Sequence, residues 1–293
     1  MEKTLLFRQN NGLPSPLTCL SVGTKGKFVI CGDAESNIFI VDTRNGKLKK
    51  TIVEHAGKIS GVCFIEDRFH ILSCSWDATT RLWDTKEKRS PRVLKHATEV
   101  KALAASQELG KGVAGARDGE IKIFSLSTLK NLRNVQAHTS DVSGVAIIDD
   151  TAKLVSTSWD GECKIWNMTS YEYEDTIFKT DERIRALTVT PDGMKIILGM
   201  HSGKILVINS ENPSEVTELK GHTDVVEALS IDSTGERLVS GSWDRTIRLW
   251  SLNSNKEFES GNLLAGITAV QWDPKLEVVY SVDFSGAVTS WSI

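Results

Sequence analysis

The sequence predicts an all-β protein made of seven four-stranded antiparallel blades in one ring, which is a seven-bladed β-propeller. Three observations lead to this prediction. Residues 221–250 have the pattern of three short strands joined by tight turns. This pattern recurs seven times along the 293 residues at intervals of 41 or 42 residues, and repeats of that length are typical of propeller blades. The chain also begins with a strand-like segment outside the repeats, and its last repeat stops after the third strand.

The stretch 221–250 shows the repeat most clearly. Apolar and polar residues alternate over 225–231, a turn follows at 232–235, and a second alternating run comes next. A second turn at 243–245 leads into the third strand at 247–250. Alternation with a period of two indicates strands with one buried face, and the short polar breaks indicate turns. Every other repeat is a looser copy of this stretch.

Three columns of equivalent residues align the repeats. The first is the apolar residue that ends the third strand: Val41, Trp83, Phe124, Trp166, Ile208, Trp250 and Trp291. The second lies six residues earlier, in the turn: Glu35, Asp77, Asp118, Asp160, Ser202, Asp244 and Ser285. The third lies 28 residues before the first: Leu13, His55, His96, His138, Thr180, His222 and Leu263. A turn Asp can bond its own backbone, and the His lies beside it if the preceding strand folds back.

The columns divide the chain into seven blades without a linker or a second domain. The expected approximate bounds are 16–54, 55–95, 96–137, 138–179, 180–221, 222–262, and 263–293 together with 3–9. We expect residues near Leu5 to Arg8 to form the outer strand of the seventh blade. This pairing would close the ring and remove exposed strand edges.

The repeats carry Gly-His or a variant upstream and Trp-Asp or a variant in the turn, and with these features the chain resembles the WD-repeat family over essentially its whole length. The resemblance implies a buried chain of hydrogen bonds in each complete blade, joining the His, a strand hydroxyl, the turn Asp and the Trp indole. The complete sets are His55, Asp77 and Trp83; His138, Asp160 and Trp166; and His222, Asp244 and Trp250. The candidate hydroxyls are Ser73 or Ser75, Ser156 or Ser158, and Ser240 or Ser242.

A fully satisfied buried network stiffens a blade, whereas an incomplete one costs stability. Blades 2, 4 and 6 are therefore expected to be the stiff blades. Blade 3 keeps His96 and Asp118 but has Phe124 in place of Trp. Blades 1, 5 and 7 lack both the His and the Asp, and we expect them to rely on packing alone.

Composition narrows the class of protein. A net charge of −3 gives no support to general affinity for nucleic acid or membranes. No apolar run reaches the roughly 20 residues that span a bilayer, and the start of the chain lacks the apolar core of a secretion signal. The cysteines form no C-x-x-C pair, and we expect them to be buried in strands in a reducing compartment: Cys19, Cys31, Cys63, Cys74 and Cys163. We expect a cytoplasmic or nuclear protein.

The sequence offers no catalytic or metal-binding constellation. Four of the six histidines belong to the repeat column, and no H-E-x-x-H, phosphate-binding loop or G-x-S-x-G motif occurs. Paired carboxylates at 149–150 and 181–182 fall in turns, where solvated acids are ordinary. We therefore expect no enzymatic activity, no cofactor, no metal and no small-molecule substrate.

One rim of the ring remains as the expected interaction surface. The residue before the turn column should face outward there, and four of the seven are aromatic: Ala34, Trp76, Arg117, Trp159, His201, Trp243 and Phe284. Exposed aromatic clusters are typical of protein interfaces. The resemblance adds two columns on this rim, three and five residues after the His column. Their charged members are Lys58, Lys101, Arg183 and Arg185 against Glu99, Asp141 and Glu227.

Together with Arg117, the rim carries five basic and three acidic residues, so it is positive relative to the whole chain. We expect it to bind a protein or an extended peptide that has apolar anchors and acidic or phosphorylated groups. Two alternatives stay open: the charges merely solvate the rim, or the rim binds single-stranded nucleic acid, against which the small excess of charge argues. The expected protein is a non-catalytic scaffold, a monomeric ring within a larger complex.

A second function is suggested by the end of blade 2. Trp83, Asp84 and Lys86 resemble the box through which some WD-repeat substrate receptors dock on the propeller adaptor of cullin-RING ubiquitin ligases. Val41 replaces the Trp of this box in blade 1, and Cys74 and Thr80 stand where small and apolar residues are favoured. The alternative is therefore a ubiquitin-ligase substrate receptor that docks through a different face of the ring.

Overall fold

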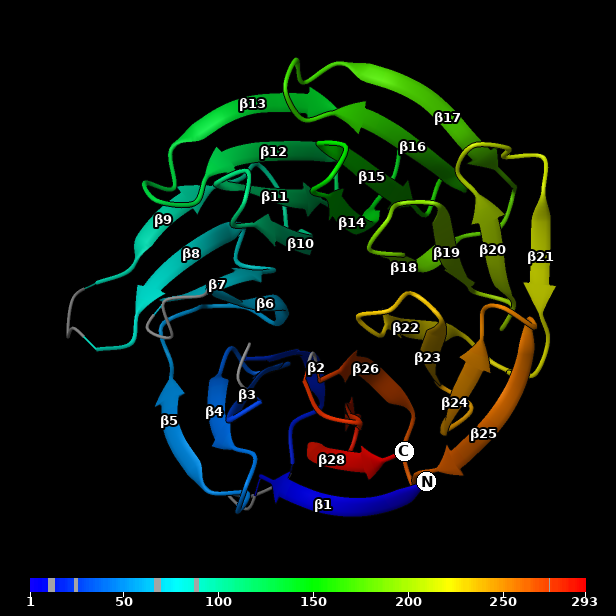
Figure 1. Ribbon diagram of the computed structural model, residues 1–293. Coiled ribbons are helices and arrows are strands. Elements are labelled where there is room, and N and C mark those ends of the chain that lie inside the picture. Colours follow the sequence, from blue (N-terminus) through cyan, green and yellow to red (C-terminus); the bar gives the residue numbers. More distant parts are fainter. Residues whose placement is uncertain (10–13, 24–25, 66–69, 87–89, 274) are drawn as a thin grey trace.

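The computed structural model describes residues 1–9, 14–23, 26–65, 70–86, 90–273 and 275–293. This part of the chain contains 28 strands and no helix, and so none that could cross a bilayer. The strands form seven four-stranded antiparallel sheets, which surround a central opening as the blades of a ring (Figure 1). The predicted seven-bladed β-propeller is confirmed. Leu13 of the third column lies outside the described residues.

Each blade consists of an inner strand, two middle strands and an outer strand. The inner strands are β2 (Leu17–Val22), β6 (Ile59–Ile65), β10 (Val100–Ser106), β14 (Val142–Ile148), β18 (Ile184–Val189), β22 (Val226–Ile231) and β26 (Ile267–Trp272). The second strands are β3 (Phe28–Asp33), β7 (His70–Ser75), β11 (Lys111–Ala116), β15 (Lys153–Ser158), β19 (Lys195–Met200), β23 (Arg237–Ser242) and β27 (Val278–Asp283). The third strands are β4 (Ile38–Asp42), β8 (Thr79–Asp84), β12 (Glu120–Ser125), β16 (Glu162–Asn167), β20 (Ile205–Asn209), β24 (Thr246–Ser251) and β28 (Ala287–Ser292).

The outer strands are β5 (Leu48–Ile52), β9 (Arg92–Lys95), β13 (Asn131–Gln136), β17 (Tyr173–Lys179), β21 (Val216–Leu219), β25 (Lys256–Asn262) and, for the seventh blade, β1 (Glu2–Arg8). Burial is greatest in the second strands and least in the outer strands. In β7 every residue after the first is buried, whereas in β5 every residue before the last is exposed. Neighbouring blades cover both faces of the second strands, so most of their residues after the first are small or apolar.

Seven apolar clusters hold the described parts of the blades together, one between each pair of neighbours. The first column of the repeat always lies in the cluster shared with the preceding blade. Trp83 of blade 2 packs with Ile30 of blade 1, and Trp250 of blade 6 packs with Ile197 of blade 5. The column therefore recurs because each interface between blades is filled from this position.

The ring is closed by the N-terminal strand. Strand β1 pairs with β28 in antiparallel register, with Leu5 opposite Thr289 and Phe7 opposite Val288. Phe7 also packs against the apolar cluster that blades 1 and 7 share. The predicted closure of blade 7 by the first residues of the chain is thus confirmed.

All five cysteines are free and lie in strands. Burial raises the pKa of Cys19 to about 12 and that of Cys63 to about 11. The thiols are therefore protonated at neutral pH and act as small apolar core groups.

Candidate protein-binding site at the mouth of the channel

A buried hydrogen-bond network fixes the turn between the second and third strands of blade 2. His55 Nδ1 lies 2.7 Å from a carboxylate oxygen of Asp77, and His55 Nε2 lies 2.8 Å from Ser73 Oγ. The Trp83 indole N–H donates to the same hydroxyl at 2.7 Å. Asp77 also accepts the backbone N–H of Ala56. The turn that carries the rim residue is thereby tied to the core and to the preceding loop.

The same contacts recur in two further blades. They join His138, Asp160, Ser156 and Trp166 in blade 4, and His222, Asp244, Ser240 and Trp250 in blade 6. Of the two candidate hydroxyls in each blade, the earlier one bridges the His and the Trp. The later one accepts the backbone N–H of the turn Asp, as Ser158 does from Asp160 at 3.0 Å. Both serines therefore have structural roles.

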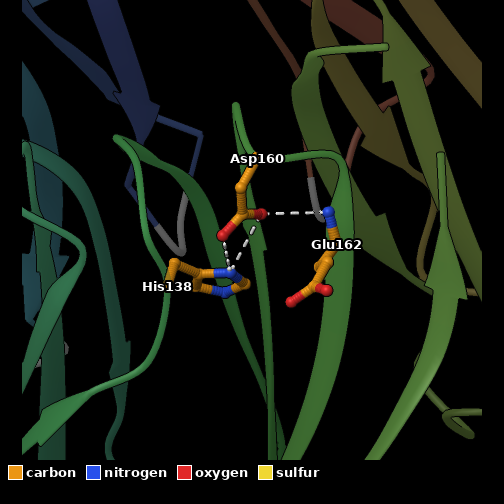
Figure 2. A group of neighbouring side chains, drawn as sticks. All are labelled: His138, Asp160 and Glu162. Carbon is orange, nitrogen blue, oxygen red and sulfur yellow. Dashed lines mark hydrogen bonds and ion pairs between the residues drawn. The ribbon is translucent and has the colours of Figure 1, made fainter. Parts of the chain in front are cut away.

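Figure 2 shows Asp160 between the His138 ring and the backbone N–H of Glu162. Burial raises the pKa of Asp160, but hydrogen bonds from His138 and from backbone N–H groups outweigh this and hold the pKa below its ordinary range. These three residues are grouped as a metal centre would be. However, both ring nitrogens of His138 are already bonded, and the Glu162 carboxylate pairs with Lys164 and Lys179. The group serves the turn.

Blade 3 keeps the His and the Asp but not their contact. Ala114 stands where the three blades with complete networks have the bridging Ser, and His96 Nε2 lies 2.9 Å from Thr80 Oγ1 of blade 2 instead. His96 Nδ1 is buried without a hydrogen-bond partner among the described residues. Burial, together with the charge of Lys122, lowers the pKa of His96 to about 4. This His is therefore neutral and bonds to the neighbouring blade.

The expectation that blades 1 and 7 rely on packing alone is wrong. Asp33 Oδ1 accepts the backbone N–H groups of Glu35 and Asn37, at 2.9 and 2.8 Å. Asp283 plays the same part in blade 7, where its Oδ1 accepts the Ser285 N–H at 2.8 Å. Both aspartates stand two residues before the turn column, at the position of the later Ser in the complete blades. A carboxylate there bonds the turn without help from a His.

The turns surround a cavity of about 440 Å³ at one end of the central channel. All seven inner strands line the channel, and the cavity shares with it one residue from each of these strands. Seven of the nine predicted binding residues line the cavity: Lys58, Trp76, Lys101, Trp159, Arg185, Trp243 and Phe284. The other two, Arg117 and Arg183, are exposed but do not line it.

The seven predicted residues that line the cavity form one continuous row of side chains, which we call the aromatic-cation arc. Lys58 Nζ lies 4.8 Å from the centre of the Trp76 ring, and Lys101 Nζ lies 4.4 Å from Trp76 and 5.0 Å from Trp159. The Arg185 guanidinium lies 4.9 Å from the Trp159 ring and 5.4 Å from that of Trp243.

The arc ends where Trp243 meets Phe284 edge to face, at 5.7 Å between ring centres. Trp76 and Phe284 are each 41% exposed, whereas Trp159 and Trp243 are half-buried under their cationic neighbours. The expected outward position of this column thus applies fully to two of its aromatic residues and partly to the other two. The Trp243 N–H is buried and has no acceptor among the described residues.

Most of the positive charge in the cavity is neutralised inside it. Lys101 pairs with Asp141 of the next blade at 3.1 Å, and Arg185 pairs with Glu227 at 2.6 Å. Lys58 forms no ion pair with any described residue. Burial lowers its pKa, although the Glu227 charge acts in the opposite direction. Lys58 is thus the one lining cation, among the described residues, whose charge no bonded carboxylate offsets.

The predicted rim residues outside the cavity have partners of their own. Arg117 donates to Glu99 at 2.8 Å, and the Arg183 guanidinium lies 5.0 Å from the Trp159 ring. Sequence reasoning missed Leu264, which is 87% exposed and stands one residue after the His column, where blades 4 and 6 have Thr139 and Thr223. A large apolar residue at a position that is small or polar in those blades is the signal that could have found it.

The residues of the alternative docking box lie at the other end of the strands, away from the cavity. Asp84 ends β8, and its Oδ1 accepts the Lys86 backbone N–H at 2.9 Å. In blade 1, the equivalent Asp42 is fully buried and its carboxylate pairs with Arg44 and Lys49. The blade 1 carboxylate is therefore already engaged inside the protein.

Comparison with known proteins supports the assignment of the repeats. Residues 46–84, 129–167 and 213–251 match the family described as WD domain, G-beta repeat. Each match ends just after the Trp of a blade with a complete network.

Three relatives illustrate the range of similarity. Periodic tryptophan protein 2 homolog of Mus musculus is 36% identical over 72 residues, 24% of this chain and 8% of that protein. U3 small nucleolar RNA-associated protein 15 homolog of Gallus gallus is 23% identical over 265 residues, 89% of this chain and 42% of that protein. SAGA complex subunit Spt8 of Schizosaccharomyces pombe is 27% identical over 111 residues, 37% of this chain and 19% of that protein. The chain spans less than half of the length of each of these relatives. Its matched repeats and its seven-bladed ring place the chain in the WD-repeat family.

Proposed function

We propose that this protein is a non-catalytic scaffold that holds a partner protein through an extended segment seated in the cavity at the channel mouth. The observation that carries this proposal is the aromatic-cation arc. It lines a cavity of about 440 Å³ with four aromatic rings and three cations contributed by six blades. Buried aromatic and Arg anchors commonly supply most of the binding energy at protein interfaces, and a cavity of this size suits a few side chains of a peptide.

The polar groups of the cavity support binding and not catalysis. Its two carboxylates, Asp141 and Glu227, are in ion pairs. Two of its hydroxyls serve contacts between blades: Ser60 Oγ donates to the Val100 carbonyl at 2.6 Å, and Thr268 Oγ1 donates to the Leu17 carbonyl at 2.6 Å. No described lining residue combines a nucleophile with a neighbouring base, which acyl or glycosyl transfer would require.

The relatives support a place within a larger assembly. One of them is named as a subunit of the SAGA complex, and another as associated with U3 small nucleolar RNA. We extend this to the present chain as a monomeric ring that works inside a multi-protein complex. Of the two compartments expected from the sequence, these names favour the nucleus. Fluorescent tagging in the source cell tests the location, and light scattering of the purified ring tests the monomer.

The binding site is tested by capture of partners on the immobilised protein. Trp76→Ala and Phe284→Ala remove the two exposed rings of the arc, and Phe258→Ala removes an equally exposed ring on the outer strand β25. We expect the first two variants to lose the captured partner and the third to keep it. The lysate is treated with nuclease so that capture through nucleic acid is excluded, and the melting temperature of each variant is measured.

Two outcomes would contradict the proposal. If both rim variants fold and still capture the same partner as the unchanged ring, the partner binds another surface. If nuclease abolishes capture, the ligand is nucleic acid and not protein. The ubiquitin-ligase alternative predicts a different result, in which Asp84→Ala loses an adaptor protein while the Trp76 and Phe284 variants retain it.

A further inference from the structure

We propose that the segment seated in the channel-mouth cavity presents one side-chain carboxylate, from an Asp or Glu, to Lys58 and places a large apolar side chain against Phe284, while phosphorylated side chains are rejected. This inference rests on the proposed function, because it specifies the occupant of the same cavity. It narrows the broader expectation of an acidic or phosphorylated ligand to a carboxylate.

A ligand in the cavity would meet both paired and unpaired charges. Three cations line the cavity, but Lys101 and Arg185 are already paired with Asp141 and Glu227. One positive charge, that of Lys58, remains without a bonded carboxylate among the described lining residues. A single carboxylate matches this charge. A phosphate monoester carries about −1.5 to −2 at neutral pH, so it would bring more negative charge than the cavity can neutralise.

The two carboxylates that line the cavity also disfavour a phosphorylated ligand. Both acids are partly accessible from the cavity that they line: the side chains of Asp141 and Glu227 are 13% and 27% exposed. A phosphate would face these like charges at short range. Arg185 cannot turn toward a ligand without leaving Glu227, because both its Nε and its Nη2 donate to that carboxylate. Freeing it would leave Glu227 as an unpaired, partly buried charge, which is costly.

The cations that stack on the aromatic rings exclude cationic ligands. Aromatic cages bind lysine or methylated lysine through the open faces of their rings. Here the protein's own cations already occupy those faces: Lys58 and Lys101 stack on Trp76, and Lys101 and Arg185 stack on Trp159. A positively charged side chain would meet the three like charges that already stack on these rings. The arc therefore favours an anionic group.

The apolar end of the site lies at Phe284. Phe284 is 41% exposed and packs edge to face on Trp243. The loop before β26 lies against this pair, since a Cβ on Gly266 would meet the Phe284 ring at 3.0 Å. The same loop carries Leu264, which is 87% exposed. Phe284 and Trp243 therefore form the apolar end of the cavity lining, and the neighbouring loop adds an exposed apolar residue.

The charged end of the site at Lys58 and the apolar end at Phe284 are separated by one blade. Lys58 belongs to blade 2 and Phe284 to blade 7, and only blade 1 separates them, as the order β6, β2, β26 around the opening in Figure 1 shows. On the rim of blade 1 the position before the turn is Ala34, so no aromatic side chain stands at this position between the two ends. A segment that enters over blade 1 would meet Lys58 on one side and Phe284 on the other. The acid and the apolar residue should therefore lie within a few residues of each other.

The test uses short fluorescent peptide pools, acetylated and amidated at their ends, and fluorescence polarisation. Each nonapeptide has a fixed Leu or Phe two residues after its central residue, which is Glu, Gln, phosphoserine or Lys. We expect the Glu pool to bind about tenfold more tightly than the Gln pool, because hydrogen bonds to charged groups are stronger than neutral ones. The phosphoserine and Lys pools should bind no better than the Gln pool.

Substitutions in the protein locate the effect. Lys58→Met should abolish the preference for Glu over Gln. Arg117→Met, at an exposed rim cation outside the cavity, is the matched control and should preserve the preference. Glu227→Gln frees the Arg185 guanidinium, so it should raise affinity for the phosphoserine pool by about tenfold. Melting temperatures establish that each variant folds.

The inference is overturned if the phosphoserine or Lys pool binds best, if no pool binds, or if Lys58→Met keeps the preference for Glu. It is also overturned if a Gln pool with a free terminal carboxylate binds more tightly than the amidated Glu pool, because the carboxylate would then come from a chain end. These results leave the proposed function intact when Trp76→Ala still loses the captured partner. Retained capture by both folded rim variants, Trp76→Ala and Phe284→Ala, would instead refute the proposed function itself.

Discussion

Replacing Ser156 with Ala removes the hydroxyl that holds the blade 4 network together. Ser156 is fully buried, and its Oγ lies 2.8 Å from His138 Nε2 and 2.9 Å from Trp166 Nε1. The substitution leaves both of these buried groups without a partner. Each such group costs about 1 to 3 kcal/mol, so we expect the free energy of unfolding to fall by about 2 to 6 kcal/mol.

Blade 7 offers a matched control at the equivalent position. Ser281 is equally buried, but among the described residues its Oγ accepts only the Trp291 indole N–H, at 2.8 Å, because this blade has no His. Ser281→Ala therefore leaves one buried group unpaired instead of two. We expect it to cost about 1 to 3 kcal/mol, half the loss in blade 4.

Equilibrium urea unfolding followed by circular dichroism measures both losses. The comparison requires that the free energy of unfolding depends on urea concentration with the same slope in both variants as in the unchanged protein. The reasoning is refuted if Ser281→Ala costs as much as Ser156→Ala. It is also refuted if Ser156→Ala costs less than about 1 kcal/mol, because the network would then add nothing to the packing of the blade.

Three further predictions concern acidity, closure and the thiols. Because the pKa of His96 is about 4 in the folded protein against 6.5 ordinarily, the unfolded chain takes up this proton first as the pH falls. Stability should therefore drop by up to about 3 kcal/mol between pH 6.5 and 4, and His96→Gln should show a smaller drop in urea titrations across that range; an unchanged drop would be a contrary result. Deleting residues 2–8 removes the six residue pairs between β1 and β28, so we expect a loss of about 5 kcal/mol or more and aggregation in size-exclusion chromatography, whereas an unaltered melting temperature and a monodisperse peak would argue against closure by β1. Buried thiols with raised pKa values should react with a thiol reagent only after unfolding; rapid labelling of the native protein would contradict their placement in the core.

The fold could be predicted because one physical requirement repeats. Every interface between blades is filled by an apolar residue near the end of the third strand, so Trp83, Trp166 and Trp250 recur at a nearly constant spacing. Closure by β1 followed from an unpaired strand at each end of the repeats. The hydrogen-bond partners of His55 and its equivalents were less certain, because two serines two residues apart both point toward the same face of a strand.

The parts that could not be predicted depend on substitutions between positions. Asp33 and Asp283 bond their turns from a position two residues before the expected one. In blades 1 and 7 the turn column itself has Glu35 and Ser285 instead of Asp. His96 turns to Thr80 because Ala114 offers it no hydroxyl. In both cases a different residue satisfies the same backbone or ring group, which a search for one fixed set of residues does not detect.

The charges of the rim were predicted individually but not as pairs. Lys101 and Asp141 are 40 residues apart, and Arg185 and Glu227 are 42 residues apart. Both separations are close to one repeat, so each pair joins neighbouring blades across the mouth of the channel. Lys58 and Glu99 are also about one repeat apart in the sequence, yet Glu99 pairs with Arg117. The spacing alone therefore does not distinguish the paired cations from Lys58.

Hydrogen–deuterium exchange of the ring, alone and with its captured partner, tests the central claim most directly. The account predicts that binding slows exchange at the turns 76–78, 159–161 and 243–245, which surround the cavity, and leaves 42–46 and 84–86 at the other end of the blades unchanged. Slower exchange confined to those two distant segments would contradict the claim that the channel mouth is the binding site.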